Sequence, residues 1–260
     1  MISNSLVEFS LFFKIPSSID LLLTQTLISS FFRPPNFAIF NKDLKGSWDL
    51  VQSFCFLYKT FKKLKEHWGS IDFLVHAIGF SNKEELRGRY IETSKENFTN
   101  TLAISTFSLT EVAKKAESIL NQGGSILTLT YYGSEKVLPH YNVMGVAKAA
   151  LESSVRYLAM DLGKKNIRVN SLSAGTIKTL AASGIGDFRY IMKWNELNSP
   201  LKRNVTQNEV GKAALFLLSD MSSGVTGENL HVDSGYHIVG MKAEDAPDID
   251  VVTGRKENDH

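Results

Sequence analysis

Residues 130–148 read TYYGSEKVLPHYNVMGVAK, and this stretch decides the fold that we predict. An apolar segment typical of a strand comes before it, and a helical pattern begins at Asn142. Tyr141 and Lys148 are seven residues apart, so on that helix they lie two turns apart on nearly the same face. A second tyrosine, Tyr131, stands ten residues before Tyr141. An ammonium in this place can hold a sugar hydroxyl while a phenol faces a substrate oxygen, a layout that favours hydride chemistry at a carbonyl-like group.

Strand-like and helix-like segments alternate on both sides of this stretch. The predicted strands cover residues 71–80, 124–130, 167–172 and 230–235, and the predicted helices cover 60–68, 94–118, 142–162 and 206–218. The strand at 71–80 is a nearly continuous apolar run, typical of a parallel strand covered on both faces. Gly163 is the expected C-cap of the third helix, and Thr206 with Glu209 has the spacing of a capping box. The alternation predicts an α/β fold with a Rossmann-like, doubly wound parallel sheet.

Length and composition favour one large α/β domain. The chain has 260 residues, of which 43% are hydrophobic and 22% charged. A net charge of +2 gives no strong field for nucleic acid. The single cysteine, Cys55, cannot form an internal disulfide, which favours a reducing compartment, and we expect a cytoplasmic protein. No apolar run is long enough to predict a membrane span, and we predict no metal site.

The composition changes sharply near residue 60. Nine of the sixteen phenylalanines come before this point, together with only one alanine, Ala38, and one glycine, Gly46. We therefore expect an atypical N-terminal segment at residues 1–55, a Rossmann-like domain at 56–242, and an acidic, mobile tail at 243–260. Three origins are open for the first segment: a wrong start or shifted reading frame, a degraded gene product, or a natural substitution. The abrupt change favours the first two.

From about residue 61 to 241 the chain resembles the NADH-type enoyl-acyl-carrier-protein reductases of the short-chain dehydrogenase/reductase superfamily. The resemblance rests on HAIGF at 76–80, KEELRGRY at 83–90, YNVMG at 141–145 with Lys148, SAGTIKTLAASGI at 173–185, VTGE at 225–228 and HVD at 231–233. The seven-residue spacing separates this branch from carbonyl reductases of the superfamily, which place the lysine four residues after the tyrosine. Position 145 is glycine here, which argues against a general carbonyl reductase.

The resemblance implies reduction of a trans-2-enoyl thioester on acyl-carrier protein, in the elongation cycle of type II fatty acid biosynthesis. It gives Tyr141 the role of stabilising the enolate oxygen. Lys148 would hold the nicotinamide ribose, and Tyr131 would lie near the reacting double bond as a third catalytic residue. It also implies NADH as cofactor, with NADPH left open, and a homotetramer.

The same resemblance assigns the remaining site residues. Backbone near Gly79 would let the cofactor approach closely. The cofactor-binding set is Ile78, Gly79, Lys148, Ala174, Ile177 and Thr179. The substrate-binding set is Ala77, Leu86, Tyr131, Met144, Ala181, Ile185 and Phe188. At position 176, a threonine replaces the proline usual in the family, and His76 is expected to be structural.

One expected feature is missing from the sequence. A dinucleotide fold normally opens with a strand, a glycine-rich turn and a helix whose N-terminus receives the pyrophosphate. Before Gly69 the only glycine is Gly46, so neither that strand nor that turn is recognisable. We therefore expect the chain to bind a dinucleotide poorly or to fold poorly. The alternative function is an inactive or truncated reductase-like protein, acting at most as a non-catalytic subunit or binding module.

Overall fold

The computed structural model describes residues 10–13, 50–177 and 188–248, with side chains from residue 57 onward. Four parallel strands lie side by side in chain order: β2 (Ile71–His76), β3 (Leu120–Thr130), β4 (Arg168–Ala174) and β5 (Asn229–Val232). A short strand, β1 (Ser10–Phe13), runs antiparallel along the edge of β2. The predicted parallel α/β sheet is confirmed.

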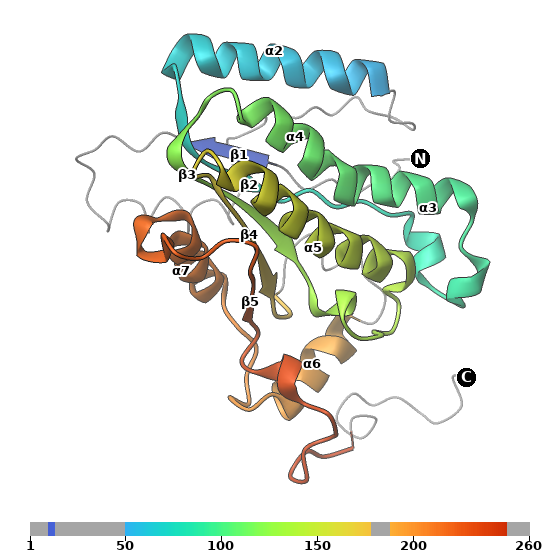
Figure 1. The fold of residues 1–260 in the computed structure, drawn as a ribbon. Coiled ribbons are helices and arrows are strands. Elements are labelled where there is room, and N and C mark those ends of the chain that lie inside the picture. Colours follow the sequence, from blue (N-terminus) through green and yellow to red (C-terminus); the bar gives the residue numbers. More distant parts are fainter. Residues whose placement is uncertain (1–9, 14–49, 178–187, 249–260) are drawn as a thin grey trace.

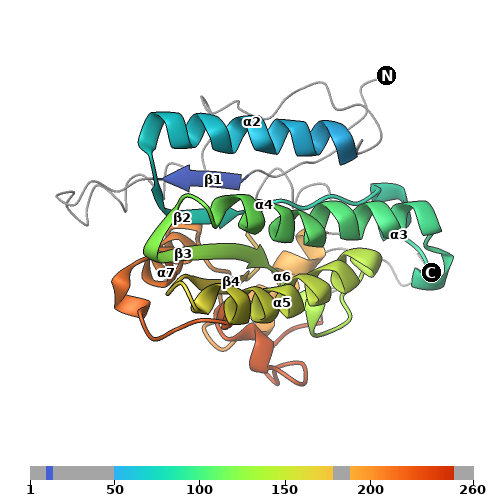
Figure 2. The same ribbon diagram turned by 45° about the horizontal axis from the view of Figure 1, so that its top comes forward.

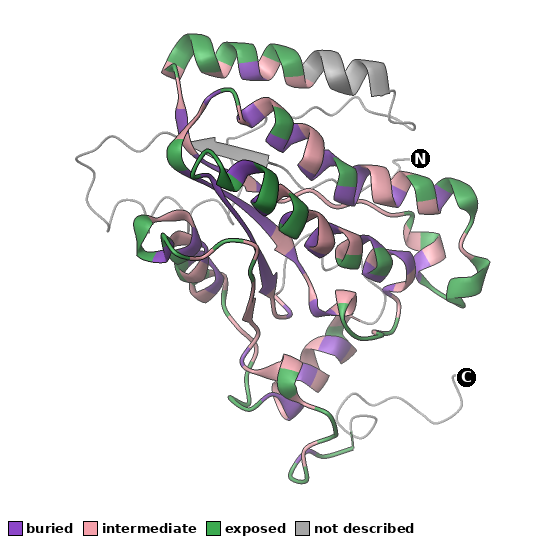
Figure 3. Ribbon diagram, viewed as in Figure 1, coloured by how far each residue is buried: buried purple, intermediate pink, exposed green. Residues whose placement is uncertain are grey.

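Helices cover both faces of the sheet (Figures 1 and 2). On one face, α2 (Leu50–Trp68), α4 (Ser108–Ala116) and α5 (Asn142–Gly163) pack over the buried strand residues Ile71, Leu74, Ile126 and Val169. On the other face, α7 (Gln207–Leu218) packs over Leu127 and Leu172. Neighbours such as Ile126 and Leu127 point to opposite faces, as strand geometry requires. Figure 3 shows the resulting band of buried residues along the strands.

The predicted helix at 94–118 is confirmed as one helical run from Lys95 to Ala116. It contains a π-helical turn at Ala103–Phe107 between α3 (Lys95–Leu102) and α4. Ser94 caps the start, because its hydroxyl accepts from the amide of Asn97. In the π turn, Thr106 donates to the carbonyl of Ala147 on α5, and Ser105 bonds both backbone groups of Phe80. These contacts give the turn partners outside the helix, which propensity alone does not predict.

Several predicted boundaries move. The strand predicted at 71–80 ends at His76, because the backbone of Phe80 pairs with Ser105 and leaves the sheet. Gly163 is the last residue of α5 and not its cap; the left-handed residue that follows is Asn166, with φ 55°. The capping box of Thr206 and Glu209 is confirmed. Helix α6 (Phe188–Asn198) was not predicted.

Within the described part of the chain, no helix is both long and apolar enough to cross a membrane.

Candidate functional site

Tyr141 stands at the N-cap of α5, where its ring packs against two glycines. A Cβ added at Gly133 would lie 2.4 Å from Cδ1 of the Tyr141 ring, and one added at Gly145 would lie 2.6 Å from the carbonyl oxygen of Gly133. Both distances are shorter than any real contact, so only glycine lets the turn after β3 approach the helix this closely. The close packing of the turn against α5 therefore requires the glycine at position 145.

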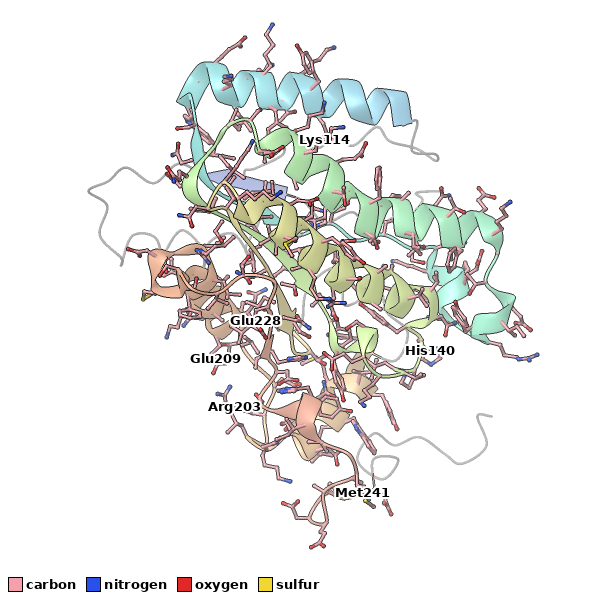
Figure 4. The ribbon with its side chains drawn as sticks, viewed as in Figure 1. Lys114, His140, Arg203, Glu209, Glu228 and Met241 are labelled. Atoms are coloured by element: carbon pink, nitrogen blue, oxygen red, sulfur yellow. The ribbon has the colours of Figure 1, made fainter. Side chains whose placement is uncertain are left out.

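The backbone is unusual on both sides of Tyr141. His140 and Asn142 adopt positive φ angles of 57° and 34°. Figure 4 shows His140 at the turn that leads into α5. Such residues cost free energy and cluster at functional sites, where surrounding contacts hold them. Here the Asn142 amide donates to the carbonyls of Glu85 and Gly88, which joins the 83–90 loop, with its buried Leu86, to the start of α5.

Lys148 lies two turns into α5, half-buried, among the ends of two strands. Its ammonium donates to the carbonyl of Leu129 at 2.9 Å. A Cβ built on Gly79, in the loop after β2, would lie 3.9 Å from its Nζ. The structure therefore brings together Lys148, Gly79 and the strand that leads to Tyr131.

His76, the last residue of β2, is fully buried beneath this group. Its Nδ1 pairs with the hydroxyl of Thr128 and its Nε2 with that of Ser108, each at 2.9 Å. Burial, and then the charge of Lys148, lower the pKa of His76 to about 3. The imidazole is therefore neutral at physiological pH. Both ring nitrogens are occupied, so the structural role expected from the sequence is confirmed.

Tyr131 and Tyr141 face each other at the carboxyl edge of the sheet. Their ring centroids are 5.2 Å apart in an edge-to-face arrangement at 72°. The hydroxyl of Tyr131 lies 3.3 Å from Oγ1 of Thr176, which follows β4. The amide of Asn195, on α6, donates to the same Thr176 oxygen. Burial raises the pKa of Tyr131, against the hydrogen bond from Thr176, so the phenol stays protonated over the neutral range.

Glu152 is a part of the site that sequence reasoning missed. It is buried on α5, one turn after Lys148, and its Oε1 accepts from the hydroxyls of Thr130 and Ser134 at 2.5 Å each. These two donors stand on either side of the Tyr131–Gly133 segment, so one carboxylate holds both ends of the turn that carries Tyr131. The sequence could have indicated Glu152, because Tyr141, Lys148 and Glu152 share one helical face. Thr176 and Asn195 were also not predicted as site residues. Thr176 was noted in the sequence only as a replacement for proline.

The remaining predicted residues fall into three groups. Ala77 and Ile78 are half-buried in the segment that follows β2, and Ala174 ends β4 with Ile177 three residues beyond it. Met144 lies in the first turn of α5, and Phe188 begins α6. The predicted residues outside the described part of the chain are Thr179, Ala181 and Ile185.

The arrangement has the ingredients for acid-assisted reduction at a polarised carbonyl. Two phenols and one ammonium lie where the parallel strands end, which is where open α/β sheets bind ligands. A Cβ added at Gly79 would lie in ordinary contact with the Lys148 ammonium, so the backbone of the loop after β2 runs close to this charge. The described residues contain no cluster of three or more side chains suited to a metal ion.

Comparison with known proteins agrees with this geometry. The sequence profile of a family described as Enoyl-(Acyl carrier protein) reductase matches residues 51–237, so the match begins somewhat earlier than the predicted residue 61. Enoyl-[acyl-carrier-protein] reductase [NADH] 1 of Rhizobium meliloti is 71% identical over 193 residues, covering 74% of this chain and 71% of that protein. A reductase of the same description from Rickettsia typhi is 59% identical over 180 residues, covering 69% of each chain.

Solved structures give the same result. The enoyl-(acyl-carrier-protein) reductase of Anaplasma phagocytophilum in complex with NAD has a TM-score of 0.72 and 58% identity, covering 76% of this chain and 74% of that one. The Bacillus cereus reductase, with NADP+ and indole naphthyridinone, has a TM-score of 0.72 and 52% identity, covering 74% of each. Both identities are high enough to show more than a shared fold. By sequence and by structure, this chain belongs to the enoyl-(acyl-carrier-protein) reductase family.

Proposed function

We propose that this protein reduces the carbon–carbon double bond of trans-2-enoyl thioesters carried by acyl-carrier protein, with NADH as the reductant, in fatty acid biosynthesis. The observation that carries the proposal is Lys148 beside Gly79, two helical turns after Tyr141, in a chain 71% identical over 193 residues to an NADH-dependent reductase of this description. The similarity to NADH-dependent reductases supports this function over the non-catalytic alternative.

We propose that the nicotinamide half of the cofactor binds among described residues at the carboxyl edge of the sheet. Gly79 presents open backbone beside the Lys148 ammonium, and Ala174 and Ile177 lie at the neighbouring strand end. When bound, the cofactor supplies a hydride to the β-carbon of the enoyl group. We propose that Lys148 holds the nicotinamide ribose, and that Ile78 and Thr179 complete this half of the site.

Tyr141 is the residue that we propose to stabilise the developing charge. Addition at the β-carbon moves negative charge to the thioester oxygen, and a fixed phenol donor lowers the energy of that enolate. Gly133 and Gly145 fix the ring, so its hydroxyl needs little reorganisation during the reaction. Lys148 adds positive potential on the same helical face. Solvent then protonates the α-carbon.

The acyl chain needs an apolar lining. We propose that Ala77, Leu86, Met144 and Phe188 provide it, together with Ala181 and Ile185. Leu86 is buried, and its loop is held against the start of α5 because the Asn142 amide donates to the carbonyl of Glu85. Tyr131 would lie at the inner end of this lining, near the double bond.

Steady-state kinetics with crotonyl thioester test the proposal. The wild-type chain should consume NADH in the presence of the thioester, and Tyr141→Phe should lower kcat about 100-fold, as loss of one enolate donor predicts. Tyr58→Phe is the matched control, because this exposed tyrosine lies on α2 and should leave the rate unchanged. No thioester-dependent NADH loss by the wild type, or equal rates for both variants, would contradict the proposed function.

Cofactor affinity needs its own measurement. The scarcity of glycine before Gly69 leads us to expect NADH to bind more weakly than about micromolar. A fluorescence titration of the full chain with NADH measures the dissociation constant directly. Micromolar binding would show that residues other than a glycine-rich turn receive the pyrophosphate.

Assembly and organisation complete the proposal. Large apolar side chains are exposed on the π turn and α5, namely Phe107, Tyr157 and Met160, and this supports the homotetramer that we propose. Light scattering should give about four times the 29.0 kDa chain mass. The family match at 51–237 supports a reductase domain at 56–242, between the segments 1–55 and 243–260. We place the enzyme in the cytoplasm.

A further inference from the structure

A buried hydrogen-bond chain joins the tip of Tyr131 to helix α6. Thr176 is 4% exposed and Asn195 is 7% exposed, so neither polar group has solvent available as a partner. The Asn195 amide donates to Thr176 Oγ1, and that oxygen lies 3.3 Å from the Tyr131 hydroxyl. Three polar groups, from the segments that follow β3 and β4 and from α6, thus meet at one point.

The positions of the three residues follow from the sheet. Thr130 pairs with Ser173 across the β3–β4 ladder, so the segments that follow the two strands leave the sheet side by side. Tyr131 comes directly after Thr130, and Thr176 comes three residues after Ser173. Gly175 permits this path, because a Cβ there would lie 2.7 Å from Cα of Asp233. The contact is therefore set by strand register and by a close backbone approach.

The direction of these hydrogen bonds determines how they act on the Tyr131 hydroxyl. Nδ2 of Asn195 can only donate, so it occupies a lone pair of the Thr176 oxygen and leaves the threonine proton for another acceptor. The Tyr131 hydroxyl lies within hydrogen-bond distance, where either hydroxyl can be the donor, and we assign the donor role to Thr176. A phenol that accepts this hydrogen bond keeps its own proton for a group in the site. Donation to the phenol oxygen also favours its charged form.

We propose that Thr176, fixed by Asn195, is a positioning residue that orients the Tyr131 hydroxyl toward the reacting part of the substrate. This inference rests on the proposed function of the site. Without the threonine hydroxyl, the Tyr131 ring would keep its edge contact with Tyr141 but its hydroxyl would lose the partner that fixes it. Burial, Tyr236 and Asp233 raise the pKa of Tyr131. The hydrogen bonds with Thr176 and Asn195 lower it and so act in the opposite direction.

A double-mutant cycle tests whether Thr176 acts through Tyr131. Thr176→Val keeps the shape and removes the hydroxyl, so kcat should fall about three- to tenfold while the KM for NADH stays unchanged. The same change made in Tyr131→Phe should have no further effect. Thr176→Ser should restore the wild-type rate, and Thr99→Val, on the exposed side of α3, should be neutral. If Thr176→Val lowers kcat by the same factor in both backgrounds, or if Tyr131→Phe keeps full activity, the proposal is wrong.

A second readout needs no catalysis. In the full chain with ring-labelled tyrosine, NMR follows the ionisation of Tyr131, identified by its absence from Tyr131→Phe. Thr176→Val should raise the pKa of Tyr131, and Thr176→Ser should not. If Thr176→Val folds poorly, Asn195→Ala should raise the same pKa. A wild type without reductase activity would overturn the proposed function, whereas an unchanged Tyr131 pKa would overturn only the positioning role of Thr176.

Discussion

The two halves of α5 are built for different tasks. The first half, Asn142–Glu152, begins with a residue at positive φ, contains a glycine pressed against another loop, and buries a carboxylate. The second half, Ser153–Gly163, buries Val155, Ala159 and Leu162 in the main core. One continuous helix thus carries strain and polar groups at the carboxyl edge of the sheet, while its other end supplies apolar stability. Substitutions in the second half should therefore change stability without changing the candidate site, and the two halves can be perturbed separately.

The largest effect on stability should come from the second half. Leu162→Ala removes a side chain that is 4% exposed, and the cavity should lower the free energy of unfolding by about 2–5 kcal/mol. The kcat of the molecules that remain folded should not change. Denaturant unfolding gives the first quantity, and active-site-normalised kinetics gives the second. A large loss of kcat per folded molecule would mean that the halves are not separable.

A matched pair of glycine substitutions compares the halves directly. Gly145→Ala places a Cβ 2.6 Å from the Gly133 carbonyl oxygen, so the Gly133 loop and the Tyr141 ring must shift. The free energy of unfolding should therefore fall by about 1–3 kcal/mol, and kcat should fall by about 10-fold or more. Gly163→Ala has no atom within 4 Å of the added carbon and should stabilise the helix by up to about 1 kcal/mol. Thermal unfolding and kinetics on both variants check this. Similar results for the two would contradict the assignment of strain to the first half.

The third effect is on the pH dependence of stability and concerns His76, which is buried and lies near the Lys148 charge of the first half. The unfolded chain binds a proton at His76 below about pH 6.5, whereas the folded chain does so only below about pH 3. Stability should therefore fall as the pH drops through this window, by up to about 1.4 kcal/mol per pH unit from this group. His76→Gln should flatten that slope in denaturant titrations, and His67→Gln, on the exposed face of α2, should not. An unchanged slope in His76→Gln would exclude a buried neutral imidazole.

Sequence analysis predicted candidate side chains for the site but not the contacts that hold them. Tyr141 and Lys148 were predicted from their spacing on a helix, and the role of Tyr131 from the family resemblance. The π turn at Ala103–Phe107, the bonds of Thr176 and the role of Glu152 were not predicted, because each depends on a contact between segments far apart in the chain. The strand end at His76 belongs with these, because the backbone of Phe80 bonds Ser105, which is distant in the chain.

Transfer of deuterium tests the central claim most directly. The wild-type chain is given crotonyl thioester and NADH carrying deuterium at both C4 positions, and the saturated product is examined by NMR. The account predicts one deuterium on the β-carbon and none on the α-carbon, since the reductant supplies the first hydrogen and solvent the second. Deuterium on the α-carbon, or no saturated product at any NADH concentration, would contradict the assignment of this site to enoyl-thioester reduction.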